Sequence, residues 1–183
     1  MGSVYVMGVD PGFSSVGVAI VSVCSSWEYV SDVRVIRTKK SGKKKNIRAM
    51  DDDFNRSVFI AGQMQSIIEH WRPVAIVAEE FSLVRNASSS AKVGRFWGIL
   101  AALSLLHKLP VVQVMAVDVK ELLCGNRSVS KKDVQGVLLE RYSGFGVFME
   151  STPKSLWEHG FDAVGVVVAG LDSDVIRMAL KCS

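Results

Sequence analysis

The sequence predicts a single α/β domain with a mixed central sheet of about five strands, the first three antiparallel, flanked by helices. Two observations support this fold class: apolar, β-branched runs of strand length open the chain, and later apolar runs alternate with stretches of helical periodicity. No repeat or linker marks a domain boundary, and 183 residues can enclose one core. We therefore expect residues 1–183 to form one domain.

The N-terminal part is expected to be a three-stranded meander. The apolar run from Tyr5 to Val9 predicts a buried strand that ends at Asp10, because Pro11-Gly12 turns the chain. Small and β-branched residues alternate from 15 to 23 and predict a second strand, paired to the first through a tight hairpin. A third strand is plausible over 27–38.

Helices and short buried strands are expected in the rest of the chain. A helix begins at the acidic residues 51–53, which suit a helix N-terminus, and ends before Pro73, with Phe54, Val58 and Met64 on its inward face. The later elements are expected in this order: a strand at 74–78, an irregular polar stretch at 81–90, a helix at 91–109, a strand at 111–117, a short helix at 119–124, a helix at 130–143, a loop at 144–153 and a buried helix from about 157 to 171.

Basic residues are concentrated in one segment. The formal net charge is +4, yet eight Lys or Arg residues and no acid lie between Arg34 and Arg48. This segment is either a solvated hairpin tip or a contact for a polyanion such as nucleic acid. The acids at 51–53 are better explained by helix capping and by charge balance against this segment than by a metal site.

Several classes of protein are disfavoured. The longest uncharged apolar run, 96–106, is too short to span a membrane, and no basic segment precedes an apolar stretch at the N-terminus, so we expect neither a membrane span nor a signal peptide. Cys24, Cys124 and Cys182 include no C-x-x-C pair. This usage predicts a cytoplasmic or other reduced compartment and no zinc site.

Polar side chains are placed where apolar segments force them inward. Asp10 and Glu79 end two predicted buried strands, although Asp10 could instead be a turn residue that caps its own backbone. His159 and Asp162, three residues apart on a buried helix, share one face. If the four converge, their negative charge calls for a cation. Carboxylates with at most one imidazole suit Mg²⁺ or Mn²⁺, and two such ions about 4 Å apart support attack of water on a phosphodiester.

A set of motifs in fixed order covers essentially the whole chain. It comprises Asp10-Pro11-Gly12 after a first strand, Glu79 after a later strand, Arg85-Asn86-Ala87-Ser88 leading into Lys92-x-Gly94-x-x-x-Gly98, Lys131 opening a late helix, and His159-x-x-Asp162-Ala163. This ordered set is similar to the RuvC family of Holliday-junction resolvases, within the RNase H-like superfamily.

The resemblance implies an RNase H-like fold and a homodimer that cuts two opposed strands of a four-way or other branched DNA junction with Mg²⁺ or Mn²⁺. It implies that Asp10, Glu79, His159 and Asp162 are catalytic metal ligands and that Lys131 lies close to the scissile phosphate. Family members have Asp or His at the position of His159; histidine here removes one negative charge and makes metal binding sensitive to protonation. Glu79 is preferred to Glu80 because of its spacing from Arg85-Asn86-Ala87.

DNA contacts are expected from the basic segment and from residues near the site, namely Lys39, Lys40, Lys43, Lys44, Lys45, Phe81, Arg85, Lys120 and Lys132. Where the family has an aromatic residue that wedges bases apart, this chain has Ser82, with Phe81 and Leu83 beside it. Gly94-x-x-x-Gly98 permits close packing of the 91–109 helix, either on the sheet or on a twin helix in the dimer.

Two other functions stay open. An actin or sugar-kinase type of ATP-binding domain also opens with a strand, Asp and Gly, but it needs a second phosphate loop and a longer, two-lobed chain. A nucleic-acid-binding module that has lost catalysis would keep the fold, yet it has no use for buried carboxylates.

Overall fold

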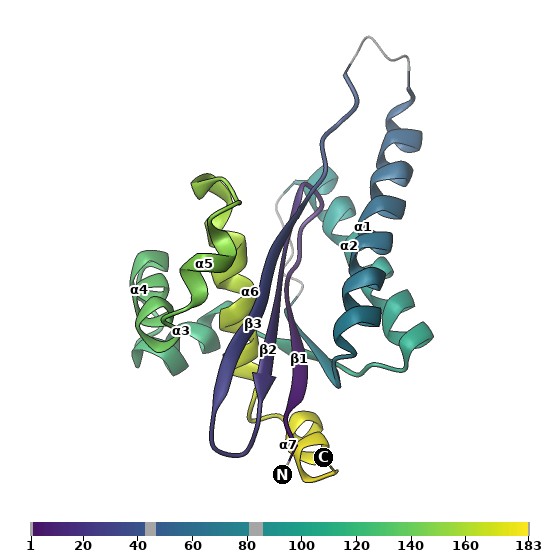
Figure 1. Cartoon of the computed structure of the whole chain (residues 1–183). Helices are drawn as coiled ribbons and strands as arrows, with labels where there is room; N and C mark the ends of the chain where they lie inside the picture. The colour runs from purple at the N-terminus through teal and green to yellow at the C-terminus, as the bar shows by residue number, and fades with distance from the viewer. Residues whose placement is uncertain (1, 43–46, 81–85, 183) are drawn as a thin grey trace.

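A computed structural model of the protein, which describes residues 2–42, 47–80 and 86–182, contains one five-stranded mixed sheet flanked by helices (Figure 1). The predicted fold class is confirmed. The strands are β1 (Val4–Asp10), β2 (Ser15–Val23), β3 (Glu28–Arg37), β4 (Ala75–Glu79) and β5 (Val111–Val114). The helices are α1 (Ala49–Trp71), α2 (Ala87–His107), α3 (Ala116–Cys124), α4 (Lys131–Arg141), α5 (Phe145–Met149), α6 (Trp157–Gly170) and α7 (Asp174–Cys182), with the 3₁₀ turn η2 (Lys154–Leu156) before α6.

The strand order β3-β2-β1-β4-β5 places β1 at the centre of the sheet. β1 and β2 are antiparallel, as are β2 and β3, whereas β4 runs parallel to β1 and β5 runs parallel to β4. Val9 of β1 is level with Ala78 of β4, so the next residues along each strand, Asp10 and Glu79, leave the sheet at the same edge. The register of the parallel pair therefore brings the two predicted strand-end carboxylates together.

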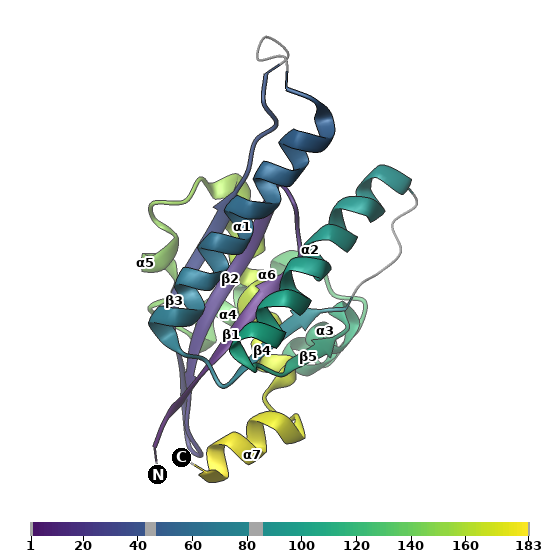
Figure 2. The ribbon, with the colours of Figure 1, turned by 90° about the vertical axis from the view of Figure 1, so that its right-hand side faces the viewer.

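Helices cover both faces of the sheet. α1 and α2 lie on one face, and their buried side chains join Met7, Ile20 and Ile76 in one core (Figure 2). α6 lies across β1 and β2 on the opposite face, with α3 and α4 packed against it and α5 against β3 (Figure 1). Most of α6 is buried, because the apolar run Ala163–Val168 leaves only its first turn polar. The N-terminus of α6 points toward the edge that carries Asp10.

Two glycines allow α6 to lie directly on the strands. A Cβ added at Gly8 would overlap the backbone oxygen of Ala163, and one at Gly17 would overlap the backbone oxygen of His159. Gly17 also pairs with Asp10 across the β1–β2 ladder. The absence of side chains at these two positions therefore sets the distance between the first turns of α6 and the end of β1.

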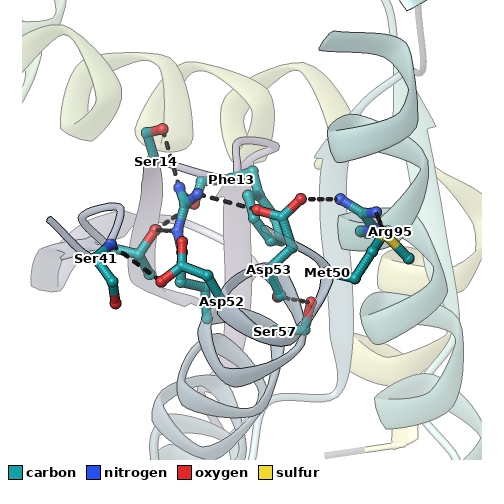
Figure 3. Close-up of polar contacts among 10 residues, drawn as sticks. Phe13, Ser14, Ser41, Met50, Asp52, Asp53, Ser57 and Arg95 are labelled. Atoms are coloured by element: carbon teal, nitrogen blue, oxygen red, sulfur yellow. Dashed lines mark hydrogen bonds and ion pairs between the residues drawn. The ribbon is translucent and has the colours of Figure 1, made fainter. Parts of the chain in front are cut away.

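Arg56 of α1 holds the turn that follows Asp10. It is 6% exposed; its Nη2 donates to Phe13 O at 3.1 Å, its Nε donates to Thr38 Oγ1 at 2.9 Å, and its guanidinium lies over the Phe13 ring. Asp53 accepts from Arg56 and from Arg95 of α2 (Figure 3). This network joins the β1–β2 turn, the end of β3 and two helices around one buried cation.

The structure corrects the expected inward face of α1. Phe54 and Val58 are 68% and 55% exposed, whereas Arg56, Ile60 and Ile67 face the sheet along with Met64. The prediction placed the large apolar residues inside, but the ion-paired Arg56 lies inside instead, so the buried stripe is rotated around the helix.

Other boundaries differ in ways that local chemistry explains. α2 begins at Ala87, not 91, because Asn86 Oδ1 caps it by accepting from Ser88 N. β5 ends at Val114, and α3 takes up residues that were expected in the strand. The loop expected at 144–153 contains the short helix α5, and α7 was not predicted at all, although Ile176 on it is fully buried.

Gly94 and Gly98 do not face the sheet. An added Cβ at either position would meet no atom within 4 Å, and both residues are exposed. Of the two packing roles left open for these glycines, contact with the sheet is therefore wrong. Within the described residues, no helix is both long and apolar enough to cross a membrane, and Cys24, Cys124 and Cys182 are free thiols.

Candidate active site

The two strand-end carboxylates occupy different depths at one edge of the sheet. The Asp10 side chain is 15% exposed and Glu79 is half-buried at the end of β4. Burial raises the pKa of Asp10, and repulsion from Asp162 adds to this against the opposing contact with His159. Burial also raises the pKa of Glu79, with further repulsion from Asp10 and Asp162. Three carboxylates therefore share one electrostatic environment.

α6 supplies the other two predicted ligands from its first turns. His159 Nδ1 lies 2.6 Å from Asp10 Oδ2, and this hydrogen bond raises the pKa of His159 even though burial opposes the shift. Asp162 follows one turn later, with 23% of its side chain exposed. The helix lies on the strand through Gly17, so its backbone position fixes the contact between His159 and Asp10.

Lys131 brings a positive charge to this group. It is the first residue of α4, whose N-terminus is fixed by a capping box between Ser130 and Asp133. Lys131 Nζ donates to Asp162 Oδ2 at 2.8 Å and lies 3.9 Å from Glu158 Oε2. Burial lowers the pKa of Lys131, but the contacts with Asp162 and Glu158 outweigh it and raise the pKa overall.

The four predicted ligands lie at one edge but are not gathered around one point. Across residues 2–42, 47–80 and 86–182, no set of three or more His, Cys, Asp or Glu side chains is grouped closely enough to hold a metal as it stands. The sequence argument left the negative charge to be balanced by a metal alone. Here the Lys131 ammonium pairs with Asp162, and His159 forms a hydrogen bond with Asp10, so protein groups stabilise part of the negative charge.

A hollow of about 100 Å³ adjoins these groups. Its polar rim is formed by Glu79, Asp162, Lys131 and Lys120, and its floor by apolar side chains of α3, α4 and α6. Glu80 has no place in this lining and is exposed. The spacing argument that preferred Glu79 therefore agrees with the side of β4 that faces Asp10 and Asp162.

The predicted DNA contacts are dispersed around the site. Lys120 borders the hollow and Lys132 is exposed on α4, while Lys39 and Lys40 are exposed beyond the end of β3. Lys43, Lys44, Lys45, Phe81 and Arg85, together with Ser82 and Leu83, lie outside the described residues. Sequence reasoning missed Gly17 and Arg56, which position the site without being part of it. No motif marks either residue.

A comparison with known families assigns the chain. A family model described as Crossover junction endodeoxyribonuclease RuvC matches residues 6–142. The chain belongs to the RuvC family. The matched range includes Asp10, Glu79 and Lys131 and ends before His159 and Asp162, so α6 is compared only through individual relatives.

RuvC proteins from bacteria match most of the chain. The protein from Pseudothermotoga lettingae is 28% identical over 134 residues, 73% of this chain and 76% of the relative. The one from Geotalea uraniireducens is 26% identical over 176 residues, 96% of this chain and 93% of the relative. The similarity to the Geotalea relative therefore extends over both the sheet and α6.

Solved structures share the fold. Thermus thermophilus RuvC in complex with Holliday junction substrate superposes with a TM-score of 0.74 at 21% identity, covering 97% of each chain. The yeast mitochondrial Holliday junction resolvase Ydc2 superposes with a TM-score of 0.61 at 15% identity, covering 97% of this chain and 80% of that one. At this level of identity the likeness establishes the RuvC architecture and leaves the site to be argued from its own residues.

Membership of this nuclease family implies use of a divalent metal, and the residues present fit one. Hard oxygen donors dominate the set, which suits Mg²⁺ or Mn²⁺ better than zinc. Burial, with added repulsion from neighbouring carboxylates, raises the pKa values of Asp10 and Glu79, and a bound cation would favour their ionised forms. Lys131 is 62% exposed, so its ammonium can leave Asp162 for solvent or for a phosphate at little cost.

Proposed function

We propose that this RuvC-family protein is a metal-dependent endonuclease that cuts four-way or other branched DNA junctions by attack of water on the phosphodiester. The carrying observation is the placement of Asp10, Glu79, His159 and Asp162 at one edge of the sheet, with Lys131 on Asp162. RuvC relatives bear the name crossover junction endodeoxyribonuclease, which supports the substrate class.

Each group of the site has a distinct role in this proposal. Asp10, Glu79, Asp162 and the neutral imidazole of His159 hold Mg²⁺ or Mn²⁺, which when bound supplies Lewis-acid polarisation of the scissile phosphodiester. The Asp10 contact fixes the orientation of the imidazole through Nδ1. Lys131, once released from Asp162, contacts a phosphate oxygen and offsets the charge that develops there.

The active form is proposed to be a homodimer through the α2 face, because two opposed strands of a junction require two sites. Gly94, Gly98, Ala101 and Ala102 are exposed along α2, and Leu105 is 79% exposed on the same helix. Small residues allow a second helix to approach closely. The free cysteines fit a reduced compartment that contains DNA, and we propose the cytoplasm or an equivalent.

Cleavage of a synthetic four-way junction, compared with a linear duplex of the same arms, tests the function. With Mg²⁺ or Mn²⁺ we expect symmetric nicks in the junction only. Asp10→Asn and Asp162→Asn should each retain junction binding and lose at least about a hundredfold in cleavage rate, the scale of losing one electrostatic group at an active site. Asp172→Asn is the matched control, because Asp172 lies beyond the opposite end of α6 and is 85% exposed.

Two outcomes separate the alternatives. Binding of the junction without cleavage in any metal by the unsubstituted protein would favour the non-catalytic binding module. Unchanged cleavage in both Asp10→Asn and Asp162→Asn would remove these carboxylates from the mechanism.

A further inference from the structure

We infer that the surface running from His159 past Lys92 to Lys40 carries the phosphate backbone of the DNA strand that leads away from the cut. We call this surface the strand groove and define it by His159, Ser14, Ser89, Lys92, Ser88 and Lys40. The inference rests on the proposed nuclease function, and it assigns a DNA contact to Lys92.

Two hollows meet at Lys92. The first, of about 330 Å³, is lined by the turn after Asp10, by His159 and by Ser89, Lys92 and Val93 of α2. The second, of about 300 Å³, lies between the first turns of α1 and α2 and the residues that follow β3. Its lining includes Lys40, Ser88 and Lys92. Because one side chain borders both, the surface is continuous from the candidate active site to the base of the basic segment.

The cations of the groove are available to a ligand. Lys92 is half-buried and Lys40 is exposed. Within the described part of the chain, neither ammonium is paired with a carboxylate, in contrast to Lys131, which is held by Asp162. Serine hydroxyls lie between them, and α2 has no acidic residue in its first turn. Positive charge with interspersed hydroxyls is the composition that contacts phosphates in protein–DNA interfaces.

Two acids also line the second hollow, and each has a partner: Asp53 is paired with two arginines, and Asp52, which is buried, accepts from a backbone amide. Asp52 Oδ1 accepts from Ser41 N at 3.0 Å, and Asp53 accepts from Arg56 at 3.4 Å and from Arg95 at 2.5 Å (Figure 3). Without the two arginines the charge of Asp53 would repel a phosphate. Arg95 therefore supports the strand groove by holding Asp53, not by direct contact with DNA.

The salt dependence of junction binding tests Lys92. Binding of a fluorescent four-way junction is measured by anisotropy between 50 and 200 mM salt in EDTA, so that no cleavage occurs. Neutralising one phosphate contact should lower the slope of log K against log salt by about 0.9, so that Lys92→Gln loses three- to fourfold less affinity over this range than the parent. Lys108→Gln is the matched control, because Lys108 follows the opposite end of the same helix.

Arg95 gives a second, indirect test. Arg95→Gln should weaken binding several-fold at low salt by exposing the charge of Asp53, and adding Asp53→Asn to it should restore the affinity. If Arg95 contacted DNA itself, the double variant would stay weak. Circular dichroism confirms that each variant is folded before binding is measured.

The outcomes separate this inference from the proposed function. If the protein cuts junctions and Lys92→Gln has the same slope of log K against log salt as the parent, the DNA contact assigned to the strand groove is wrong and the proposed nuclease function is unaffected. A reduced slope in Lys92→Gln but not in Lys108→Gln supports it. Failure of the unsubstituted protein both to bind and to cut junctions would overturn both.

Discussion

The two faces of the sheet use glycine in opposite ways. On the α6 face, Gly8 and Gly17 bring helix and strand backbones together, and an added Cβ at either position would overlap a backbone oxygen. On the other face, Gly94 and Gly98 lie on the outside of α2, where an added Cβ would meet no atom within 4 Å. The same residue type thus fixes the candidate site on one face and leaves a smooth exposed surface on the other.

This contrast teaches that the site is held by backbone contact more than by side-chain packing. His159 reaches Asp10 because its own carbonyl lies against Gly17. No side chain lies between the two backbones that could adjust to a shift of α6. The α1 and α2 face packs through ordinary side chains such as Met64, Ile60 and Leu100. Changes on the α6 face should therefore be far less tolerated than similar changes on α2.

The largest expected effect is from a matched pair of glycine substitutions. Gly17→Ala should lower the free energy of unfolding by about 3 kcal/mol or more, because a buried overlap with backbone must be relieved by moving α6. Gly94→Ala should raise it by up to about 1 kcal/mol, since alanine favours an exposed helix position. Urea denaturation measures both, and equal effects of the two substitutions would contradict the comparison.

The next effect concerns Arg56, the buried cation of α1 that contacts the β1–β2 turn and Thr38 beyond the end of β3. Arg56→Met should cost about 2 kcal/mol of unfolding free energy, because it removes charged hydrogen bonds to Phe13 O and Thr38 Oγ1. Arg95→Met is the control: it loses the contact with Asp53 but is 32% exposed, so a cost below about 1 kcal/mol is expected. A similar cost for both in thermal or urea unfolding would show that burial of Arg56 adds nothing.

A smaller effect is expected from disturbing the open face. Gly98→Arg should raise the dissociation constant of the proposed dimer at least about tenfold, because a long charged side chain would separate the two helices, and tenfold corresponds to about 1.4 kcal/mol. Gly136→Arg carries the same change on α4, at a position also free of neighbours. Sedimentation velocity should show a monomer only for Gly98→Arg; a dimer in both would move the interface elsewhere.

The smallest change is a shift in pH dependence. The Asp10 contact raises the pKa of His159, and a metal needs the unprotonated imidazole, so cleavage should fall as pH decreases through that raised pKa. Replacement of the imidazole by a carboxylate in His159→Asp should move this acidic limb down by at least about one pH unit, since the reference pKa of Asp is far below that of His. If the acidic limb of the rate–pH profile is at the same pH in His159→Asp as in the parent, the titrating group is not His159.

Much of the architecture followed from local patterns. Three parts of the fold were predictable: the three-stranded meander, the strand that ends at Glu79 and the buried helix that begins at Trp157. Apolar, β-branched runs indicate these elements, and the turn residues Pro11-Gly12 and Pro73 indicate where elements end. α7 was not predicted, although Asp174 is suited to the start of a helix. It has only nine residues, of which only Ile176 is buried, so its hydrophobic periodicity is too short to identify a helix. The start of α2 depended on recognising Asn86 as its cap.

The site was predictable as a set of residue types but not as a geometry. Asp10 and Glu79 could be predicted as carboxylates at the ends of buried strands, but the parallel pairing that puts them at one edge is known only from the structure. The pairing of Lys131 with Asp162 likewise joins residues far apart in sequence and depends on how α4 packs beside α6. The roles of Gly17 and Arg56 likewise depend on where α6 and α1 cross the sheet. Periodicity assigned Phe54 to the core because it cannot reveal that a paired arginine occupies the inward face of α1.

Direct measurement of metal binding tests the central claim, that Asp10, Glu79, His159 and Asp162 form one divalent-metal site. Titration of Mn²⁺ into the protein, followed by electron paramagnetic resonance, should show binding that weakens at least about tenfold in Asp162→Asn, the loss that even indirect partners of a metal can cause. Asp172→Asn should bind as the parent does. Equal Mn²⁺ affinity in all three proteins, or none in the parent, would contradict the account.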